Sequence, residues 1–159
     1  MKLLLLTLAL TLPLAACSSD DANPAPAEMA SAVEADLPLV TVYKTATCGC
    51  CSKWADHIEA AGFPVKTVDV TDLGAVKAEH GIPAAYGSCH TAVVDGYAVE
   101  GHVPAEDVKR LLAERPEAAG LAVPGMPIGS PGMETPGRRA DRYEVLLVQD
   151  GDATVFARH

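Results

Sequence analysis

The sequence predicts an α/β domain whose elements follow the order β-α-β-α-β-β-α. Short β-rich runs alternate with segments of helical periodicity between residues 38 and 118, and this alternation is the main evidence for the fold class. Asp95-Gly96 is a dipeptide typical of two-residue hairpin turns. We therefore expect an α/β core at residues 38–118, with residues 119–159 packed on it.

The expected strands lie at residues 38–45 and 64–71 with a hairpin at 89–102, and the expected helices at 51–63, 72–82 and 103–117. Trp54 and Ile58 have the spacing of one buried helix face. Gly62 stands where a helix ends with a glycine, and Asp72 where a side chain caps the next helix. Pro104 suits the first turn of the third helix.

The C-terminal region begins with a segment rich in proline and glycine. Residues 119–142 contain four prolines and five glycines, a density that predicts no regular element. Apolar residues are interspersed in it, so we expect an ordered loop on the domain. Residues 143–159 are two β-rich runs around Gln149-Asp150-Gly151-Asp152, which predicts a closing β-hairpin.

The N-terminus carries the signs of export. After Lys2, residues 3–14 form an apolar run that is shorter than the roughly 20 residues of a membrane span but typical of a signal peptide. The run ends in Leu-Ala-Ala-Cys17, which resembles the lipobox of bacterial lipoproteins. The resemblance implies a signal peptide at residues 1–16 and lipid on Cys17. The alternative is a simple secretory signal.

Residues 17–37 are small, acidic and polar with prolines, which predicts a disordered tether between lipid and domain. Ser18 rather than aspartate after the cysteine favours the outer membrane. We therefore expect a lipid-anchored periplasmic protein in an oxidising compartment, where thiols are paired, bound to metal or kept reduced by a partner. The net charge of −9 argues against a nucleic-acid partner.

Four further cysteines are grouped unusually. Cys48, Cys50 and Cys51 fall within four positions, and Cys89 is distant in sequence. Adjacent cysteines have Cα atoms about 3.8 Å apart, below the usual disulfide range. Cys50 and Cys51 are expected in the first turn of a helix, with Cys48 just before it. Thiols at a helix N-terminus lose their protons more readily, which suits thiol–disulfide exchange or a soft metal.

The position of this motif, between the first strand and the first helix, is that of the redox motif in thioredoxin-like proteins. The predicted fold is therefore thioredoxin-like, with a Pro/Gly-rich loop and a C-terminal β-hairpin. In that fold a cis-proline and a threonine usually precede the third strand. Here Thr91 matches, but His90 stands where the proline would be. Cys89 and His90 are thus expected to face the three clustered cysteines, and four thiols with an imidazole suit a soft metal.

The sequence resembles the CopG-type periplasmic copper-resistance proteins, a family also known as a domain of unknown function. The resemblance is carried by CGCCSKWADHIEAAGF, GIPAAYGSCHTAVVDGYAVEGHVPAEDVKRLLAERP and GLAVPGMPIGSPGME. It implies copper bound by Cys48, Cys50, Cys51 and Cys89, in a thiolate-bridged multinuclear cluster, and a role in copper handling coupled to copper redox change. His90 and His102 are further ligands that the resemblance suggests.

Met126 and Met133 lie in the Pro/Gly-rich loop. Thioethers are soft ligands that suit Cu(I), and the alternative is that both pin the loop to the core. The expected function is Cu(I) binding for copper resistance, with other periplasmic copper-handling proteins as partners.

Three other functions stay open from the sequence. A thiol–disulfide oxidoreductase would use Cys48 and Cys51, a C-x-x-C pair inside the motif. An enzyme like arsenate reductase would need an arginine pocket, and every arginine comes late in the chain. The third is a closed structural zinc site made by the four cysteines.

Overall fold

The structure, a computed structural model, describes residues 37–159. Three predicted features lie outside the described residues: the signal peptide (residues 1–16), the lipidation site Cys17 and the tether (residues 17–37). Only Leu37 at the end of the tether is described. Within residues 37–159, no helix has both the length and the apolar character to cross a membrane. The predictions for the N-terminal region stay predictions.

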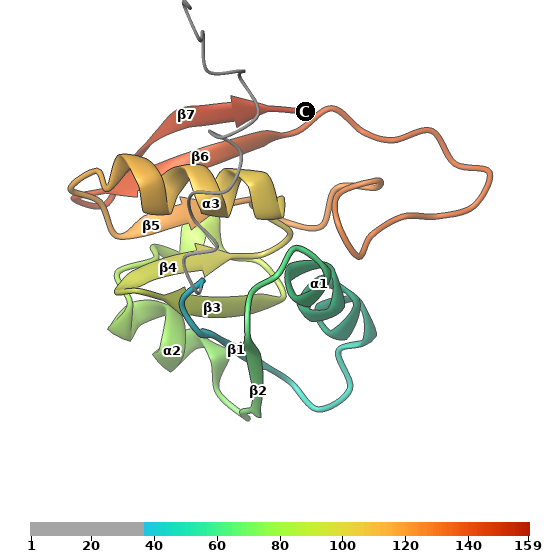
Figure 1. The fold of residues 1–159 in the computed structure, drawn as a ribbon, viewed down its shortest axis with the longest axis horizontal. Helices are drawn as coiled ribbons and strands as arrows, with labels where there is room; N and C mark the ends of the chain where they lie inside the picture. The colour runs from blue at the N-terminus through green and yellow to red at the C-terminus, as the bar shows by residue number, and fades with distance from the viewer. Residues whose placement is uncertain (1–36) are drawn as a thin grey trace, which may run out of the picture. The chain divides into compact units, whose positions relative to one another are not determined.

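The described elements are β1 (Val40–Lys44), α1 (Gly49–Ala60), β2 (Val65–Asp69), α2 (Leu73–Glu79), the 3-10 turn η1 (Ala84–Tyr86), β3 (His90–Val94), β4 (Tyr97–Glu100), α3 (Ala105–Glu114), β5 (Gly120–Ala122), β6 (Glu144–Gln149) and β7 (Asp152–Arg158). In this part of the chain the strands form one sheet in the order β2-β1-β3-β4-β5-β6-β7 (Figure 1). β1/β2 and β4/β5 are parallel, and the other neighbours are antiparallel. The predicted α/β class and the order β-α-β-α-β-β-α through α3 are confirmed.

Local sequence signals explain several element ends. Gly62, at φ 98°, follows the end of α1, where a residue with a side chain would be strained. The side chain of Asp72 accepts a hydrogen bond from Ala75 N at 3.0 Å and caps α2. Asp95 and Gly96 both have positive φ, as the predicted two-residue turn between β3 and β4 requires.

The start of α3 depends on a neighbouring helix. α3 begins at Ala105, and its N-cap residue Pro104 makes no side-chain cap. His57 of α1 supplies the acceptor instead, because its Nε2 receives the Ala105 N–H at 3.1 Å. This contact satisfies one of the unpaired amides of the first turn and joins the two helices.

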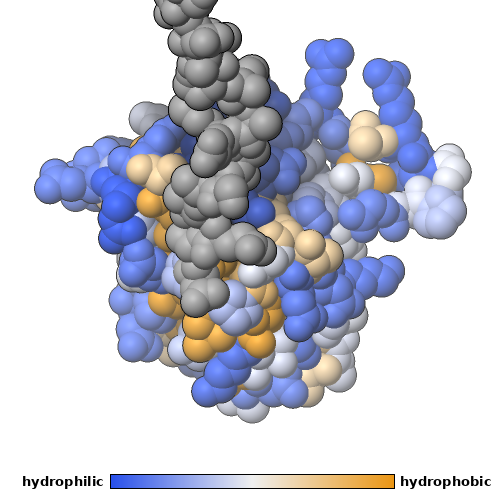
Figure 2. Space-filling model, in the orientation of Figure 1, coloured by the Kyte–Doolittle hydropathy of each residue, from blue (hydrophilic) through white to orange (hydrophobic). Residues whose placement is uncertain are grey.

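The main core lies between the sheet and the helices α1 and α3. Four side chains in it are at most 1% exposed, namely Trp54 and Ile58 of α1 and Val108 and Leu111 of α3. The indole N–H of Trp54 donates to Val103 O at 2.8 Å, so this large side chain is buried with its one polar atom satisfied. Apolar residues appear only in small groups on the largely hydrophilic face in Figure 2.

The Pro/Gly-rich segment contains a strand, so the prediction that residues 119–142 hold no regular element is wrong for its first residues. β5 pairs in parallel with β4 and antiparallel with β6. Leu121 and Ala122 are completely buried, and the prolines begin only at Pro124. Three buried residues ahead of the first proline are enough for a short central strand, because its neighbours supply the hydrogen bonds.

The predicted closing hairpin is confirmed. β6 and β7 are joined by a turn in which Asp150 and Gly151 have φ of 52° and 85°, and the pair extends the sheet beyond β5. Val145 and Val148 of β6 are fully buried. The hairpin therefore contributes apolar side chains to the interior.

Gly120 is expected to be indispensable for the β4/β5 pairing. A Cβ at Gly120 would lie 1.8 Å from Ala98 O, and its φ of 152° disfavours a side chain as well. Gly120→Ala should lower the free energy of unfolding by about 3 kcal/mol or more, measured by urea denaturation. Gly137→Ala is the control, because Gly137 has a positive φ of 75° but no atom within 4 Å of its Cβ position. Equal losses in the two variants would contradict the steric explanation.

Candidate metal centre

The N-terminus of α1 positions three sulfur atoms. Cys48 is the N-cap residue, and its Sγ accepts a hydrogen bond from Cys51 N at 3.3 Å. Cys50 and Cys51 lie in the first turn, as the sequence predicts. The cap brings the Cys48 sulfur over the helix end, where the unpaired amides and the helix dipole favour negative charge.

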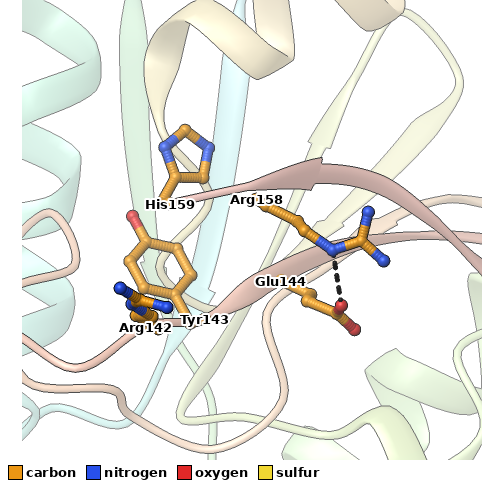
Figure 3. A pocket seen from close by; sticks show the side chains of 5 residues that line it. All are labelled: Arg142, Tyr143, Glu144, Arg158 and His159. Carbon is orange, nitrogen blue, oxygen red and sulfur yellow. Dashed lines mark hydrogen bonds and ion pairs between the residues drawn. The ribbon is translucent and has the colours of Figure 1, made fainter.

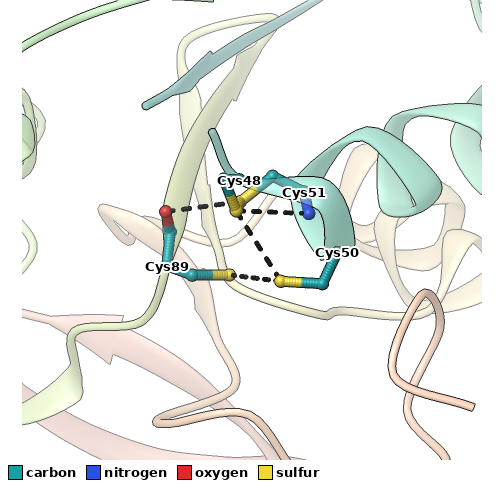
Figure 4. Close-up of side chains that lie close together, drawn as sticks. All are labelled: Cys48, Cys50, Cys51 and Cys89. Carbon is teal, nitrogen blue, oxygen red and sulfur yellow. Dashed lines mark hydrogen bonds between the residues drawn. A yellow bond between two sulfur atoms is a disulfide. The ribbon is translucent and has the colours of Figure 1, made fainter. Parts of the chain in front are cut away.

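Cys89 brings a fourth sulfur to this group from the residue before β3. The Sγ atoms of Cys48, Cys50, Cys51 and Cys89 all lie within 4.8 Å of one another. Cys50 Sγ is 3.6 Å from Cys48 Sγ and 3.9 Å from Cys89 Sγ (Figure 4). The predicted convergence of the four cysteines is thus present in the structure.

Two of the four sulfur atoms are bonded to each other. Cys48 and Cys51 form a disulfide across the first turn of α1, with Cα atoms 5.4 Å apart, and Cys50 and Cys89 are free thiols. Cys51 Sγ also lies 3.5 Å from Cys89 O. The structure therefore shows the oxidised form of the C-x-x-C pair, with the two remaining thiols facing each other.

Two imidazoles extend the site beyond Cys89. The Sγ of Cys89 lies 3.0 Å from His102 Nε2 and 3.3 Å from His90 Nδ1, and the three side chains form a second group that could hold a metal ion. His102 Nδ1 is 2.8 Å from Pro131 O. Because a carbonyl only accepts, Nδ1 carries the proton, and the lone pair on Nε2 faces the sulfur.

His90 is placed at the start of β3 and is completely buried. Its ring lies 4.5 Å from the Trp54 ring and edge-on to His102 at 5.2 Å. Its Nε2 has no hydrogen-bond partner, whereas its Nδ1 faces Cys89. The described residues contain no cis peptide bond, in agreement with a histidine where a cis-proline was expected.

Burial governs the charges in this centre. Desolvation, reinforced by the neighbouring Cys50, raises the pKa of Cys89 to about 12. Desolvation, with smaller effects of His102 and Lys77, lowers the pKa of His90 to about 3, and burial also lowers the pKa of His102. Both imidazoles are therefore neutral at pH 7 and able to offer a lone pair to a metal.

The Pro/Gly-rich loop forms one wall of the centre. A Cβ at Gly132 would lie 2.8 Å from Cys50 O and 2.9 Å from Trp54 N, so the loop backbone rests directly on the first turns of α1. Figure 1 shows this segment beside the end of α1. The residue before Gly132, Pro131, receives the His102 hydrogen bond.

The two predicted methionine ligands lie on the Pro/Gly-rich loop. Met133 follows Gly132 directly and is half-buried. Met126 is 52% exposed. The N–H of the preceding residue, Gly125, donates to Gly87 O at 3.2 Å, and Gly87 lies two residues before Cys89. Neither methionine belongs to the core of the protein, so a ligand role for both stays a prediction.

Sequence reasoning missed Glu100, which is fully buried beside the Cys89 loop and paired with Lys77 at 2.6 Å. The available signal was a single acidic residue at the end of the apolar run YAVE. Buried charges of this kind are rare unless paired.

A surface hollow lies at the C-terminal hairpin, and no cysteine lines it (Figure 3). It is lined by Arg142, Tyr143, Glu144, Arg158 and His159. Arg158 in this hollow pairs with Glu144 at 3.0 Å, and Arg110 and Arg115 pair with Asp107 and Asp95. These three arginines are thus engaged away from the cysteines.

The fold and the site together define a small α/β protein with a thiol and imidazole centre suited to soft metals. The family model described as protein of unknown function, DUF411, matches residues 86–133, the segment that carries Cys89, both histidines and the loop. No curated protein matches the chain.

Two solved structures are similar to this chain. Both are of a copper resistance protein CopG, in forms 2 and 1, and both are 48% identical to this chain. They cover 77% of this chain and 98% of their own, with TM-scores of 0.73 and 0.72. The chain belongs to the CopG family of copper resistance proteins, as the sequence motifs indicated.

Acid is expected to destabilise the fold through His90. The pKa of His90 lies at about 3 in the folded chain and near 6.5 when unfolded, so the unfolded state binds more protons between these values. Stability is therefore full above pH 6.5 and falls as the pH drops towards 3, by up to about 1.4 kcal/mol per pH unit from this group. His90→Gln should reduce the slope of unfolding free energy against pH between 6 and 4. The same slope in both metal-free proteins would contradict this.

Proposed function

We propose that this chain is a periplasmic copper-binding protein, anchored to lipid through Cys17, that holds Cu(I) for copper resistance. The observation that carries the proposal is the convergence of four cysteine Sγ atoms within 4.8 Å. The two related structures of a copper resistance protein support it, as do the export signals at the N-terminus. The expected partners are copper ions and other periplasmic copper-handling proteins.

The donor chemistry favours a soft cation. Thiolates select Cu(I) and Zn(II), and neutral imidazoles suit both metals. His90 and His102 are neutral and face Cys89, so they would extend the donor set on one side. Met126 and Met133 would add thioethers from the loop.

Charge balance favours several copper ions over one zinc ion. In the described part of the chain, the hydrogen-bond partners of the cysteine sulfurs are other cysteines, backbone groups and histidines, and none is a lysine or arginine. Beyond the partial charge at the N-terminus of α1, the charge of four thiolates would therefore be compensated by the bound metal. A single Zn(II) neutralises half of it, whereas Cu(I) ions in equal number neutralise all of it, and burying uncompensated charge is costly. A cluster with bridging thiolates meets this requirement.

The disulfide supports a redox role for the site. The closed Cys48–Cys51 bond leaves two thiols, and opening it requires two electrons and yields the four-thiol form. In the reverse direction, two thiols that close to a disulfide release two electrons and two protons, which is enough to reduce two Cu(II) ions to Cu(I). Copper oxidation state and disulfide state would thus be linked.

Anaerobic titration of the reduced chain with Cu(I) and with Zn(II), followed by native mass spectrometry, tests the proposal. We expect more than one Cu(I) per chain, because the thiolates bridge. Cys89→Ser should lower the copper stoichiometry, since Cys89 joins the cysteine group to the two histidines. Cys17→Ser is the matched control and should leave the stoichiometry unchanged. Binding of one zinc ion, together with no more than one equivalent of Cu(I), would contradict the proposed copper cluster.

A second candidate function is thiol–disulfide exchange by Cys48 and Cys51. The specific observation in its favour is the disulfide between these two residues at the N-terminus of α1, where a thiolate is stabilised. Such an enzyme needs neither Cys50 nor Cys89.

Cys50→Ser separates the two functions. An oxidoreductase should keep its rate of insulin reduction in this variant, because the Cys48–Cys51 pair is intact. A copper-cluster protein should lose bound copper, because Cys50 Sγ lies between the sulfur atoms of Cys48 and Cys89. Insulin turbidity and copper stoichiometry are measured on the same preparations. Full copper loading without Cys50 would contradict its role as a ligand.

A further inference from the structure

A buried carboxylate lies on the opposite side of β3 from His90. Glu100, the last residue of β4, is completely buried. Its Oε1 accepts from Lys77 Nζ at 2.6 Å and from Ser88 N, and its Oε2 accepts from Thr91 Oγ1 at 2.6 Å. Lys77 Nζ also donates to Thr91 Oγ1 at 3.1 Å. One carboxylate therefore joins α2, the loop before β3, and β3 itself.

The partners of Glu100 flank the metal-site residues. Ser88 directly precedes Cys89, and Thr91 directly follows His90. The carboxylate thus holds the chain on both sides of the Cys89-His90 pair. Ser88 is held further by a hydrogen bond from its hydroxyl to Gly125 O. Cys89 itself lies outside any helix or strand. These contacts therefore restrain a segment that is not held by the backbone hydrogen bonds of a helix or sheet.

Gly101 allows this close packing. A Cβ at Gly101 would lie 2.5 Å from the Cβ of Ser88 and 2.6 Å from Val123 O, and φ at Gly101 is 70°. The Gly101 N–H also donates to His90 O at 3.0 Å. The end of β4 therefore presses directly on the Cys89 segment, with a carboxylate on one residue and no side chain on the next.

We infer that Glu100, neutralised by Lys77, is the positioning residue that sets the distance of Cys89 from the cysteines of α1. The inference rests on the proposed function, since it concerns how the same site is assembled. Cys89 Sγ must stay near Cys50 Sγ, from which it is 3.9 Å away, for a metal to contact both. Displacing the Ser88–Thr91 segment by even an ångström removes that proximity.

The arrangement also explains why the charge is tolerated. An unpaired buried carboxylate is strongly destabilising, but here the carboxylate accepts three hydrogen bonds, one from the part-buried ammonium group of Lys77. An apolar pair of similar volume would fill the same space without binding Ser88 N. An apolar pair could therefore replace the ion pair without lowering the stability of the fold. It could not accept the hydrogen bond from Ser88 N that fixes the Cys89 loop.

The inference is tested by measuring the effective concentration of the Cys50 and Cys89 thiols towards each other. This quantity is obtained from the equilibrium formation of the Cys50–Cys89 disulfide in glutathione redox buffers. Cys48→Ser/Cys51→Ala serves as background, because it leaves only this pair at the site and serine is a good N-cap residue. In this background we compare Glu100→Leu, which leaves Lys77 unpaired, with Lys77→Met/Glu100→Leu, which removes both charges. Thermal unfolding is recorded for each variant.

The double variant should be more stable than Glu100→Leu, because no unpaired ammonium group remains. Its effective concentration should nevertheless stay about tenfold below the background value, because Ser88 N has lost its acceptor. Asp107→Asn is the matched control. Asp107 is also a buried carboxylate, paired with Arg110 at 3.2 Å and His159 at 2.7 Å, but it has no contact with the Cys89 loop, so the effective concentration should not change.

An unchanged effective concentration in Lys77→Met/Glu100→Leu would overturn the inference. A fall of equal size in Asp107→Asn would also overturn it, since the effect would then follow stability alone. The measurement needs no copper, so it stands whether or not the reduced chain binds Cu(I). With all four cysteines present, the double variant should also bind fewer Cu(I) ions than the parent chain, and failure of the parent to bind copper would count against the proposed function only.

Discussion

The hydrogen bond from Cys51 N to Cys48 Sγ, at 3.3 Å, is the local interaction on which the metal centre depends. It starts α1 after a connection of only four residues from β1 and brings the sulfur of Cys48 over the helix terminus. The rest of the helix is then fixed from both sides. Trp54 is anchored to Val103 O, and Gly132 leaves no space between the loop and Cys50 O. The three clustered cysteines therefore sit on a rigid end rather than on a free loop.

Cys89 is held differently, because it belongs to no regular element. Successive residues of a strand point to opposite faces, and the residues after Cys89 use both faces. His90 lies among Trp54 and His102 on the side of α1. Thr91 binds the Lys77 and Glu100 pair on the side of α2. His90 and His102 are thus neutral on the side of the metal donors, and the ion pair that holds the loop lies on the opposite side of the strand.

Much of this could be predicted from the sequence, because its signals are local. The motif C-G-C-C directly after a β-rich run places three sulfurs at a helix N-terminus, and Asp95-Gly96 specifies a hairpin. The convergence with Cys89 was predicted from its place before the third strand. Two features could not be predicted. β5 owes its existence to β4 and β6, which supply its hydrogen bonds, and the pairing of Glu100 with Lys77 joins residues of separate elements. Neither feature has a periodic signal in the sequence.

The disulfide shows why local signals leave the chemistry open. Cys48 and Cys51 are one helical turn apart, a spacing that suits either a disulfide or two metal ligands. Cys50 points instead to Cys89, so the same four sulfurs can form one bond and two thiols, or a set of four donors. With the disulfide closed, burial and the neighbouring Cys50 raise the pKa of Cys89 to about 12, so Cys89 holds its proton in this form and a metal at this sulfur would have to displace it. The contacts that place Cys89 beside Cys50 therefore matter for the site as much as the cysteines themselves.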